Sequence, residues 1–222
     1  MKERSLVIFG TGDIAQLAHF YFTTDSAYDV VAYTVDREFV QAPEFMGLPV
    51  VPFDEISSAF PPEECDLFIA LSYSRLNAVR KEKYDAGKAM GYRLASYISS
   101  KASCLTTEPI GDNCFILEDN TIQPFVRIGN NVTLWSGNHI GHHSTLRDHA
   151  FLASHIVVSG GVDIGEQCFV GVNATLRDHI RIGERCVVGA GALLLADADA
   201  EGVYVGAATE RSRIPSTRLR KI

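Results

Sequence analysis

Histidine residues gather in one short stretch of this 222-residue chain, and no other residue type points as directly to chemistry. Six of the seven His lie between residues 139 and 179, and four stand in the segment NHIGHHSTLRDH, residues 138–149. An imidazole changes its charge near neutral pH, so one of these side chains is a natural general base. The alternative is a polar outer surface that is rich in His and has no catalytic role.

A six-residue repeat must position these side chains. Every sixth residue from Ile110 to Leu194 is Ile, Leu or Val, fifteen times in succession. An α-helix repeats after about 3.6 residues and a half-buried strand after two, so a period of six indicates a chain that turns a corner after each short strand. Three such edges make one coil, and residues eighteen apart then stack at about 4.8 Å. We expect the apolar residues to fill a triangular prism whose flat faces associate with other copies.

Two further slots of the repeat have a recurrent composition. Gly follows the apolar residue at seven corners, where a tight turn favours a residue without Cβ. The position four residues after the apolar residue is small or apolar in most hexads, and Cys114, Cys168 and Cys186 occupy it. We therefore expect these thiols to be core side chains and propose no Cys as nucleophile. The five Cys include no C-x-x-C pair, which is typical of reduced thiols in the cytoplasm.

The length of the coil singles out one histidine. Gly160 follows His142 by eighteen residues, so the imidazole is expected to stack under an exposed backbone N–H. This pair suits acyl transfer, because the imidazole can deprotonate the attacking group while the amide stabilises the oxyanion that develops on a thioester carbonyl. His143 and Gly161 are related in the same way, but neighbouring strand residues point to opposite sides unless a corner intervenes, so only one of the pair is expected to face a given groove.

The first hundred residues follow a different pattern, in which apolar strand-like runs alternate with helical segments. The expected strands are residues 6–9, 30–33, 67–71 and 94–98, and the clearest helical segment is residues 76–91. This alternation predicts a parallel sheet in a Rossmann-like domain over residues 1–100, with the repeat domain and a short tail over residues 101–222.

The first expected strand ends in the turn Gly10-Thr11-Gly12-Asp13, and the second ends at Asp36. Such a turn presents backbone N–H groups and a helix N-terminus to a phosphate, while an acidic residue after the second strand can hold a ribose hydroxyl. A turn without any ligand is the alternative. Because the domain is short for a full dinucleotide fold, a mononucleotide or nucleotide-linked ligand is favoured over NAD.

Composition excludes other classes of protein. A net charge of −7 argues against nucleic acid as the main partner. No apolar run is long enough to cross a bilayer, and the apolar stretch near the start is too short for a signal peptide. The sequence therefore predicts a cytoplasmic protein without membrane insertion.

The repeat and three segments, NHIGHHSTLRD, DIGEQCFVGVNATLRD and GVYVGAATE, resemble the hexapeptide-repeat acyltransferases. The whole chain is similar to their two-domain branch, which contains sialic-acid O-acetyltransferases and N-acetyltransferases of nucleotide-linked 4-amino sugars. The resemblance implies an α/β Rossmann-like domain that receives the nucleotide-sugar, followed by a left-handed parallel β-helix. It also implies a homotrimer, acetyl-CoA as co-substrate in the groove between two prisms, and a role in surface-glycan or lipopolysaccharide biosynthesis.

The resemblance also assigns roles to individual residues. His142 matches the catalytic His, Gly160 the glycine whose amide lies near the thioester, Val172 and Ala190 the pantetheine path, and Thr11, Gly12, Asp13 and Asp36 the nucleotide-sugar contacts. His143 replaces the acidic residue that commonly follows the catalytic His, so the group that orients His142 is open. The turn carries Asp13 where related enzymes have His, which leaves the identity of the nucleotide and the sugar open.

The basic C-terminal tail has two interpretations. Its cationic residues are Arg211, Arg213, Arg218, Arg220 and Lys221. They could meet the phosphates of CoA, or they could form a solvated terminus.

The sequence predicts a sugar N- or O-acetyltransferase in which His142 assists direct attack on the thioester without a covalent intermediate or a metal. One alternative is a zinc hydratase of the γ-carbonic anhydrase type. His143 and His179 are two coils apart, too far to share zinc within one chain, and Glu184 stands where a third His would be needed. The other alternative is a trimeric scaffold that binds a nucleotide without turnover.

Overall fold

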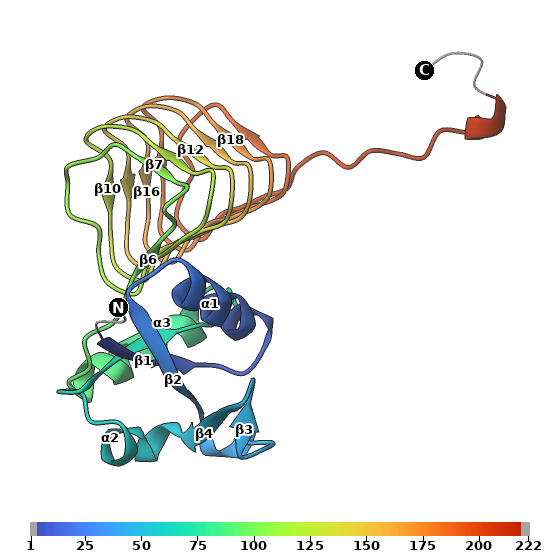
Figure 1. Cartoon of the computed structure of the whole chain (residues 1–222). Coiled ribbons are helices and arrows are strands. Elements are labelled where there is room, and N and C mark those ends of the chain that lie inside the picture. The colour runs from blue at the N-terminus through green and yellow to red at the C-terminus, as the bar shows by residue number, and fades with distance from the viewer. Residues whose placement is uncertain (1–3, 219–222) are drawn as a thin grey trace.

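The computed structural model describes residues 4–218, which form an α/β domain packed against a triangular prism of short strands (Figure 1). The α/β domain holds a five-stranded sheet in the order β3-β4-β2-β1-β5. Its elements are β1 (Arg4–Phe9), α1 (Asp13–Thr24), β2 (Tyr28–Val35), β3 (Glu44–Phe45), β4 (Leu48–Pro52), α2 (Ile56–Ala59), β5 (Cys65–Ile69) and α3 (Ala78–Ala89), with 3₁₀ turns at Arg37–Phe39 and Phe53–Glu55. All strand pairs in this sheet are parallel except the β3–β4 hairpin.

Both faces of this sheet are buried, which explains why its central strands are continuous apolar runs. Leu6 and Ile8 of β1 pack in one core cluster with α1 and with residues of the prism, while Val7 and Phe9 pack in a second cluster on the opposite face. The predicted parallel sheet is confirmed. β3, β4 and α2 were not predicted, because two prolines interrupt the apolar pattern of residues 48–52.

The fourth expected strand, residues 94–98, is divided between the two domains. Leu94 forms a single parallel bridge with Leu67 of β5. Tyr97–Ile98, however, is strand β6 and pairs with Phe115–Ile116 of the prism. The first coil therefore begins a few residues before residue 101.

Three parallel sheets form the sides of the prism. The seven-stranded sheet contains β6, β8 (Phe115–Ile116), β11 (Thr133–Leu134), β14 (Phe151–Leu152), β17 (Phe169–Val170), β20 (Val187–Val188) and β22 (Val203–Tyr204). The six-stranded sheet contains β7 (Ser103–Cys104), β9 (Thr121–Ile122), β12 (His139–Ile140), β15 (Val157–Val158), β18 (Thr175–Leu176) and β21 (Leu193–Leu194). The four-stranded sheet contains β10 (Arg127–Ile128), β13 (Thr145–Leu146), β16 (Asp163–Ile164) and β19 (Arg181–Ile182).

The strand register confirms eighteen residues per coil. His139 pairs with Val157 and Ile140 with Val158, and the same offset recurs on the other two sides. Fourteen of the fifteen repeat residues are buried, and Ile110 in the first coil is partly buried. Cys114, Cys168 and Cys186 lie in the same core with no exposed surface, as predicted. Burial raises the pKa of Cys114 and of Cys168 to about 12, which makes both thiols poor nucleophiles.

The corners of the prism have a regular backbone conformation that corrects one expectation. Every sixth residue from Asn113 to Gly191 has a positive φ, and this residue stands three positions after the apolar one. The Gly directly after the apolar residue is not in this left-handed region, and a Cβ at Gly141 would lie only 2.6 Å from the backbone N of Gly160. Close approach of successive coils, not the corner conformation, therefore requires these glycines.

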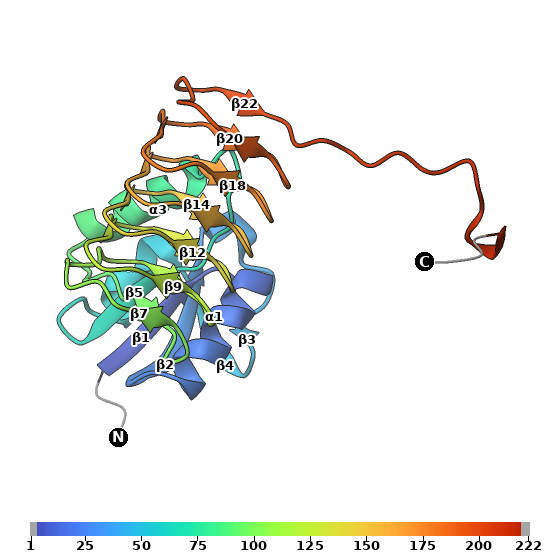
Figure 2. The same cartoon turned by 90° about the horizontal axis from the view of Figure 1, so that it is seen from above.

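The α/β domain covers the seven-stranded sheet, and α3 runs along one edge of the prism (Figure 2). After β22 the chain leaves the last coil and extends away from the body (Figure 1). Within residues 4–218, no helix is both long and apolar enough to cross a membrane.

Candidate active site

The prism has three corners that differ in what lies outside them. The open corner follows the six-stranded sheet and comprises residues 123–125, 141–143, 159–161 and 177–179. The groove corner follows the seven-stranded sheet and comprises residues 135–137, 153–155, 171–173 and 189–191. The covered corner follows the four-stranded sheet, comprises residues 111–113, 129–131, 147–149 and 165–167, and packs under α3.

His142 and Gly160 lie on top of one another at the open corner. A Cβ added to Gly160 would be 2.6 Å from Cε1 and 2.8 Å from Nε2 of His142, so only glycine leaves room for the imidazole. The ring is exposed. No residue described in the structure accepts a hydrogen bond from the Gly160 N–H, whereas the next amide, Gly161 N–H, donates to the His142 carbonyl at 2.8 Å. The predicted pair of an imidazole and a free backbone donor is present.

His143 lies beside His142, not on the opposite side of the chain as strand alternation suggests. Its φ of 59° places it at the left-handed corner position, where the chain turns between two sheets. The two imidazoles are 5.2 Å apart edge to face, and their Nδ1 atoms are 3.1 Å apart. His179, not His143, fills the space at Gly161, because its Nδ1 would lie 2.4 Å from a Cβ there.

Four of the six repeat-domain histidines, His143, His149, His155 and His179, occupy left-handed corner positions. Asn, Asp and His enter this conformation more readily than most residues, and the other corners of this prism hold several Asn and Asp. The corner conformation therefore accounts for much of the His enrichment. His142 stands one position earlier, and its ring is exposed.

The four residues predicted to contact a nucleotide-sugar line one pocket of about 670 Å³ in the α/β domain. They are Thr11, Gly12, Asp13 and Asp36. α1 begins at Asp13 after the Gly12 cap, so its N-terminus and its free N–H groups face this pocket.

Lys83 of α3 also lines this pocket, and sequence reasoning missed it. Its Nζ is 2.7 Å from Asp36 Oδ1 and lies over the rings of Phe9 and Phe53. The pocket therefore offers both a cation and a helix N-terminus to phosphate groups, next to a carboxylate that can accept from ribose hydroxyls. No sequence signal could have singled out this Lys, since it lies in an ordinary amphipathic helix and reaches the pocket only through the fold.

Val172 and Ala190 lie at the groove corner and line a second cavity of about 350 Å³. Tyr73, Phe151 and Phe169 form its aromatic wall, with Tyr73 4.6 Å from Phe169 between ring centroids. This cavity shares four lining residues with the nucleotide pocket, Ile14, Ser72, Tyr73 and Trp135, so the two are continuous. An apolar passage thus connects the nucleotide pocket to the groove corner.

The structure does not bring all predicted site residues together within one chain. The pocket of Asp36 opens toward the groove corner with Val172 and Ala190, whereas His142 and Gly160 lie at the open corner. The six-stranded sheet separates these two corners. Within one copy of the chain, the two sets of residues therefore lie at different corners of the prism.

A buried polar network holds the two domains together at the covered corner. Arg80 of α3 has no exposed side chain, and it donates to the carbonyl oxygens of Asn131, His149 and Ala150. Asn131 Nδ2 and His149 Nδ1 are 2.9 Å apart. Burial lowers the pKa of Arg80 to about 9 and, together with the nearby Lys81 and Arg80 charges, lowers that of His149 to about 4. His149 is therefore neutral and structural at pH 7.

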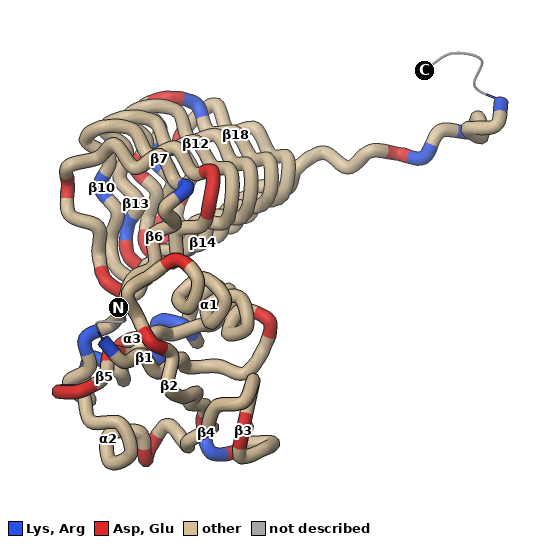
Figure 3. Tube along the Cα trace, in the orientation of Figure 1, with Lys and Arg blue, Asp and Glu red and all other residues tan. Residues whose placement is uncertain are grey.

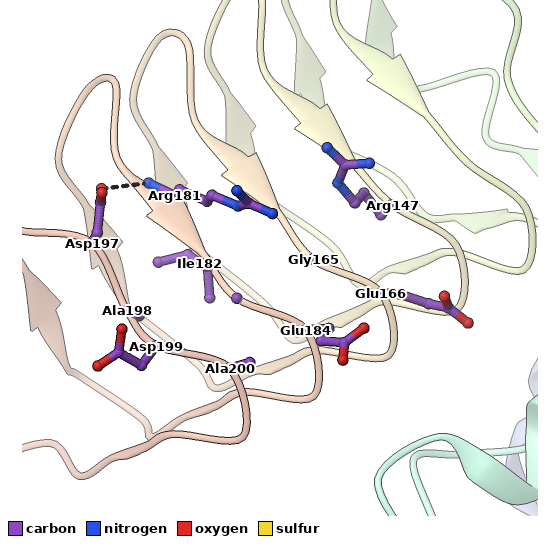
Figure 4. A pocket seen from close by; sticks show the side chains of 11 residues that line it. Arg147, Gly165, Glu166, Arg181, Ile182, Glu184, Asp197, Ala198, Asp199 and Ala200 are labelled. Carbon is purple, nitrogen blue, oxygen red and sulfur yellow. Dashed lines mark hydrogen bonds between the residues drawn. The ribbon is translucent and has the colours of Figure 1, made fainter.

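A further hollow of about 610 Å³ lies on the four-stranded side of the last coils (Figure 4). Arg147 and Arg181 line it together with several carboxylates, and the Arg181 backbone N–H donates to Asp197 at 2.8 Å. None of the predicted site residues lies there. Within residues 4–218, no three His, Cys, Asp or Glu side chains are grouped so that they could hold a metal ion.

The basic tail extends away from the coils, and Figure 3 shows basic positions along it. Arg211, Arg213 and Arg218 lie in this segment and are exposed. Arg220 and Lys221 lie outside the described residues. Within one chain, the tail does not lie along either cavity, so a contact with CoA phosphates stays a prediction.

Comparisons with known proteins support the fold. Residues 110–142 and 161–196 match the bacterial transferase hexapeptide (six repeats) family. The acetyltransferase domain of PglB from Neisseria gonorrhoeae in complex with acetyl coenzyme A is 20% identical with a TM-score of 0.81, over 92% of this chain and 97% of that one.

Two further solved structures are similar over comparable lengths. A mutant of perosamine N-acetyltransferase from Caulobacter crescentus, in complex with CoA and GDP-perosamine, is 22% identical with a TM-score of 0.79, over 91% of this chain and 93% of that one. WeeI from Acinetobacter baumannii is 18% identical with a TM-score of 0.77, over 92% of this chain and 97% of that one. The predicted architecture, a Rossmann-like α/β domain followed by a left-handed β-helix of hexapeptide repeats, is confirmed.

Proposed function

We propose that this protein is an acetyl-CoA-dependent acyltransferase that moves an acetyl group to the amine or hydroxyl of a nucleotide-linked or free sugar in surface-glycan biosynthesis. The observation that carries the proposal is the exposed imidazole of His142 beneath Gly160, whose backbone N–H is free. The complexes of similar folds with acetyl-CoA, or with CoA and GDP-perosamine, support this choice of donor and acceptor.

In the proposed reaction, the acceptor amine or hydroxyl attacks the thioester carbonyl directly. His142 removes the proton of the attacking group, and the Gly160 N–H donates to the oxyanion that develops on the carbonyl. The C–S bond then breaks, and His142 returns its proton to the sulfur, so that CoA leaves as the thiol. The buried thiols of Cys114 and Cys168, whose pKa values are raised to about 12, support a reaction without a covalent enzyme intermediate.

Assembly as a homotrimer would unite the two halves of the site. The outward residues of the six-stranded sheet are Ser103, Thr121, His139, Val157, Thr175 and Leu193, whereas the four-stranded sheet presents Arg127, Thr145, Asp163 and Arg181. A row without Asp, Glu, Lys or Arg is the side suited to an interface core. Three prisms packed with this sheet inward would bring the open corner of one copy against the groove corner of the next, because these two corners bound that sheet.

The nucleotide-sugar would then lie in the pocket of Asp13 and Asp36, with its sugar in the aromatic cavity toward the groove corner. Pantetheine would run past Val172 and Ala190 and present the thioester to His142 of the neighbouring copy. In this arrangement Lys83 and the α1 N-terminus bind the diphosphate, and Asp36 accepts a hydrogen bond from the ribose.

The experiment that tests the proposal is mass spectrometry of small-molecule products. The protein is incubated with acetyl-CoA and either nucleotide amino sugars or free sialic acids. A product heavier by one acetyl group, formed by the wild type and the His179→Gln control but not by His142→Gln, is expected. Nucleotide binding without turnover of any acceptor would instead support the non-catalytic scaffold.

A further inference from the structure

We propose that His143 is a positioning residue that accepts a hydrogen bond from the Nδ1–H of His142 and so keeps the Nε2 of His142 free to act as the base. This inference rests on the proposed function. It assigns to a second imidazole the role that an acidic residue usually has beside a catalytic His, and it predicts a pH dependence of the pair that a carboxylate would not give.

The geometry of the two rings requires one shared proton. Their Nδ1 atoms are 3.1 Å apart, and the ring planes meet at 85°. A hydrogen bond between two imidazole nitrogens needs one of them to carry hydrogen and the other to be bare. When the proton is on His142, its Nε2 is bare and can accept a proton from substrate. When the proton is on His143, the neutral His142 carries its hydrogen on Nε2 and is not a base there.

Contacts with the preceding coil hold the ring of His143 where it can accept a hydrogen bond from His142. Its backbone is in the left-handed corner conformation, with φ of 59°, and its ring lies 4.7 Å from that of Phe125, one coil earlier. The backbone N–H of His142 donates to Gln123 Oε1 at 2.8 Å, and that of His143 donates to the Pro124 carbonyl at 3.3 Å, so both residues are anchored to the preceding coil. His142 is confined from above by Gly160. Both imidazoles are therefore oriented by contacts within their own chain.

The hydrogen bond between the rings limits where hydrogens can stand on the four nitrogens of the pair. The neutral pair carries two N–H hydrogens, one between the rings and one on an outer Nε2. One further proton gives three hydrogens on four nitrogens. Since one hydrogen lies between the rings, both Nε2 atoms are then protonated, whichever ring formally carries the charge. A single protonation of either His thus removes the base.

Few other titratable groups face this pair. Gln123 and Phe125 in the preceding coil and Gly160 and Gly161 in the following coil carry no charge. His179 is the titratable residue that faces the pair, because its imidazole reaches back from two coils on and fills the space at Gly161. Arg177 and Asp178 stand beside it in the sequence. Among residues 4–218, neither imidazole forms an ion pair. A carboxylate introduced at position 143 would therefore be the dominant charge acting on His142.

The test uses His143→Glu, His143→Gln and His143→Ala in the full chain. Gln167 and Glu201 already occupy left-handed positions in this protein, so both longer side chains suit the backbone. The Ala variant should lose about tenfold in kcat with unchanged KM, since only the orientation of the base is lost. Gln should recover most of this activity, because its carbonyl oxygen accepts from Nδ1–H. His179→Gln, the same change at the equivalent corner two coils on, is the matched control.

The pH profile of kcat/KM separates positioning from a structural role. In His143→Glu the acidic limb should lie about one pH unit higher than in His143→Gln, because the carboxylate stabilises protonated His142. The proposal would be overturned if the acidic limb of the kcat/KM profile lay at the same pH in the Glu and Gln variants, or if His143→Ala kept the wild-type kcat.

A measurement without turnover keeps the two proposals distinguishable. In ¹⁵N NMR of the wild-type protein at pH 8, His142 should be predominantly the Nδ1–H tautomer, and this preference should be lost in His143→Ala. A His142 that stays Nε2-protonated contradicts the inference even if the enzyme is active. Absence of any acetylated product with the Nδ1–H tautomer present contradicts the proposed function instead.

Discussion

The open and covered corners of the prism share a backbone geometry and a residue type but differ in what lies outside them. His143 and His149 are six residues apart and have φ of 59° and 64°. His149 is buried beneath α3, hydrogen-bonded to Asn131 and in edge-to-face contact with Tyr84. His143 is exposed with its neighbour His142. The repeat therefore creates equivalent sites for His, and the packing of the second domain decides which of them can meet a substrate.

The largest expected difference between the corners is in activity. His142→Gln should lower kcat by about 10²- to 10⁴-fold because the general base is lost, while the melting temperature changes little at this exposed position. Steady-state kinetics and thermal unfolding on the same preparation measure both effects. His179→Gln should keep wild-type kcat, and equal losses in the two variants would show that the open corner has only a structural role.

At the covered corner the expected effect is on stability. Arg80→Met leaves the carbonyl oxygens of Asn131, His149 and Ala150 without their donor, which should cost about 3 kcal/mol in the free energy of unfolding. Urea denaturation measures this loss. Arg75→Met, an exposed change just before the same helix, is the control. An Arg80→Met protein as stable as the control would show that the network does not hold the domains together.

The pH dependence of stability should also distinguish the corners. The folded-state pKa of His149 is about 4, below the ordinary value of 6.5, so between these values the unfolded chain binds a proton that the folded protein does not. Stability therefore falls as pH falls through this window, by about 2 kcal/mol from pH 7 to pH 5. Urea denaturation at several pH values measures this fall, and in His149→Asn the loss of about 2 kcal/mol between pH 7 and pH 5 should be absent. In His155→Asn, at the groove corner, the pH dependence of the free energy of unfolding should be the same as in the wild type.

The smallest expected effect concerns Gly160, the glycine above the base. The backbone of Gly160 is not left-handed, so Gly160→Ala is compatible with the fold, but its Cβ would press against the His142 ring. Displacement of the imidazole should lower kcat about tenfold with little change in stability. Unchanged kcat in Gly160→Ala would mean that the ring is not confined there.

The periodic half of the molecule could be predicted from sequence far more completely than the other half. The interval of six fixes the coil, the buried residues and the stacking of His142 on Gly160, because each depends only on spacing along the chain. The interval could not show that His143 is a left-handed corner residue, because spacing alone does not say between which two residues the chain turns. Strand alternation places two neighbouring imidazoles on opposite sides only where no corner intervenes.

In the α/β domain, local pattern predicted the parallel strands and the turn of Thr11 to Asp13, but not their neighbours in space. Lys83 reaches Asp36 from a helix 47 residues later, and Trp135 joins the pocket from the other domain. Neither contact can be predicted from the spacing of residues along the chain. The same holds for Arg80, whose buried cation looks like any surface Arg in an amphipathic helix until the prism covers it.

The measurement that tests the central claim most directly is complementation between two inactive variants. His142→Gln removes the base at the open corner, and Ala190→Arg blocks the groove corner at an exposed position. If the site is assembled from the open corner of one copy and the groove corner of the next, trimers formed by co-expression in equal amounts should regain about a quarter of wild-type activity, since a quarter of the interfaces carry neither change. Activity no higher than that of either variant alone would contradict a site shared between subunits.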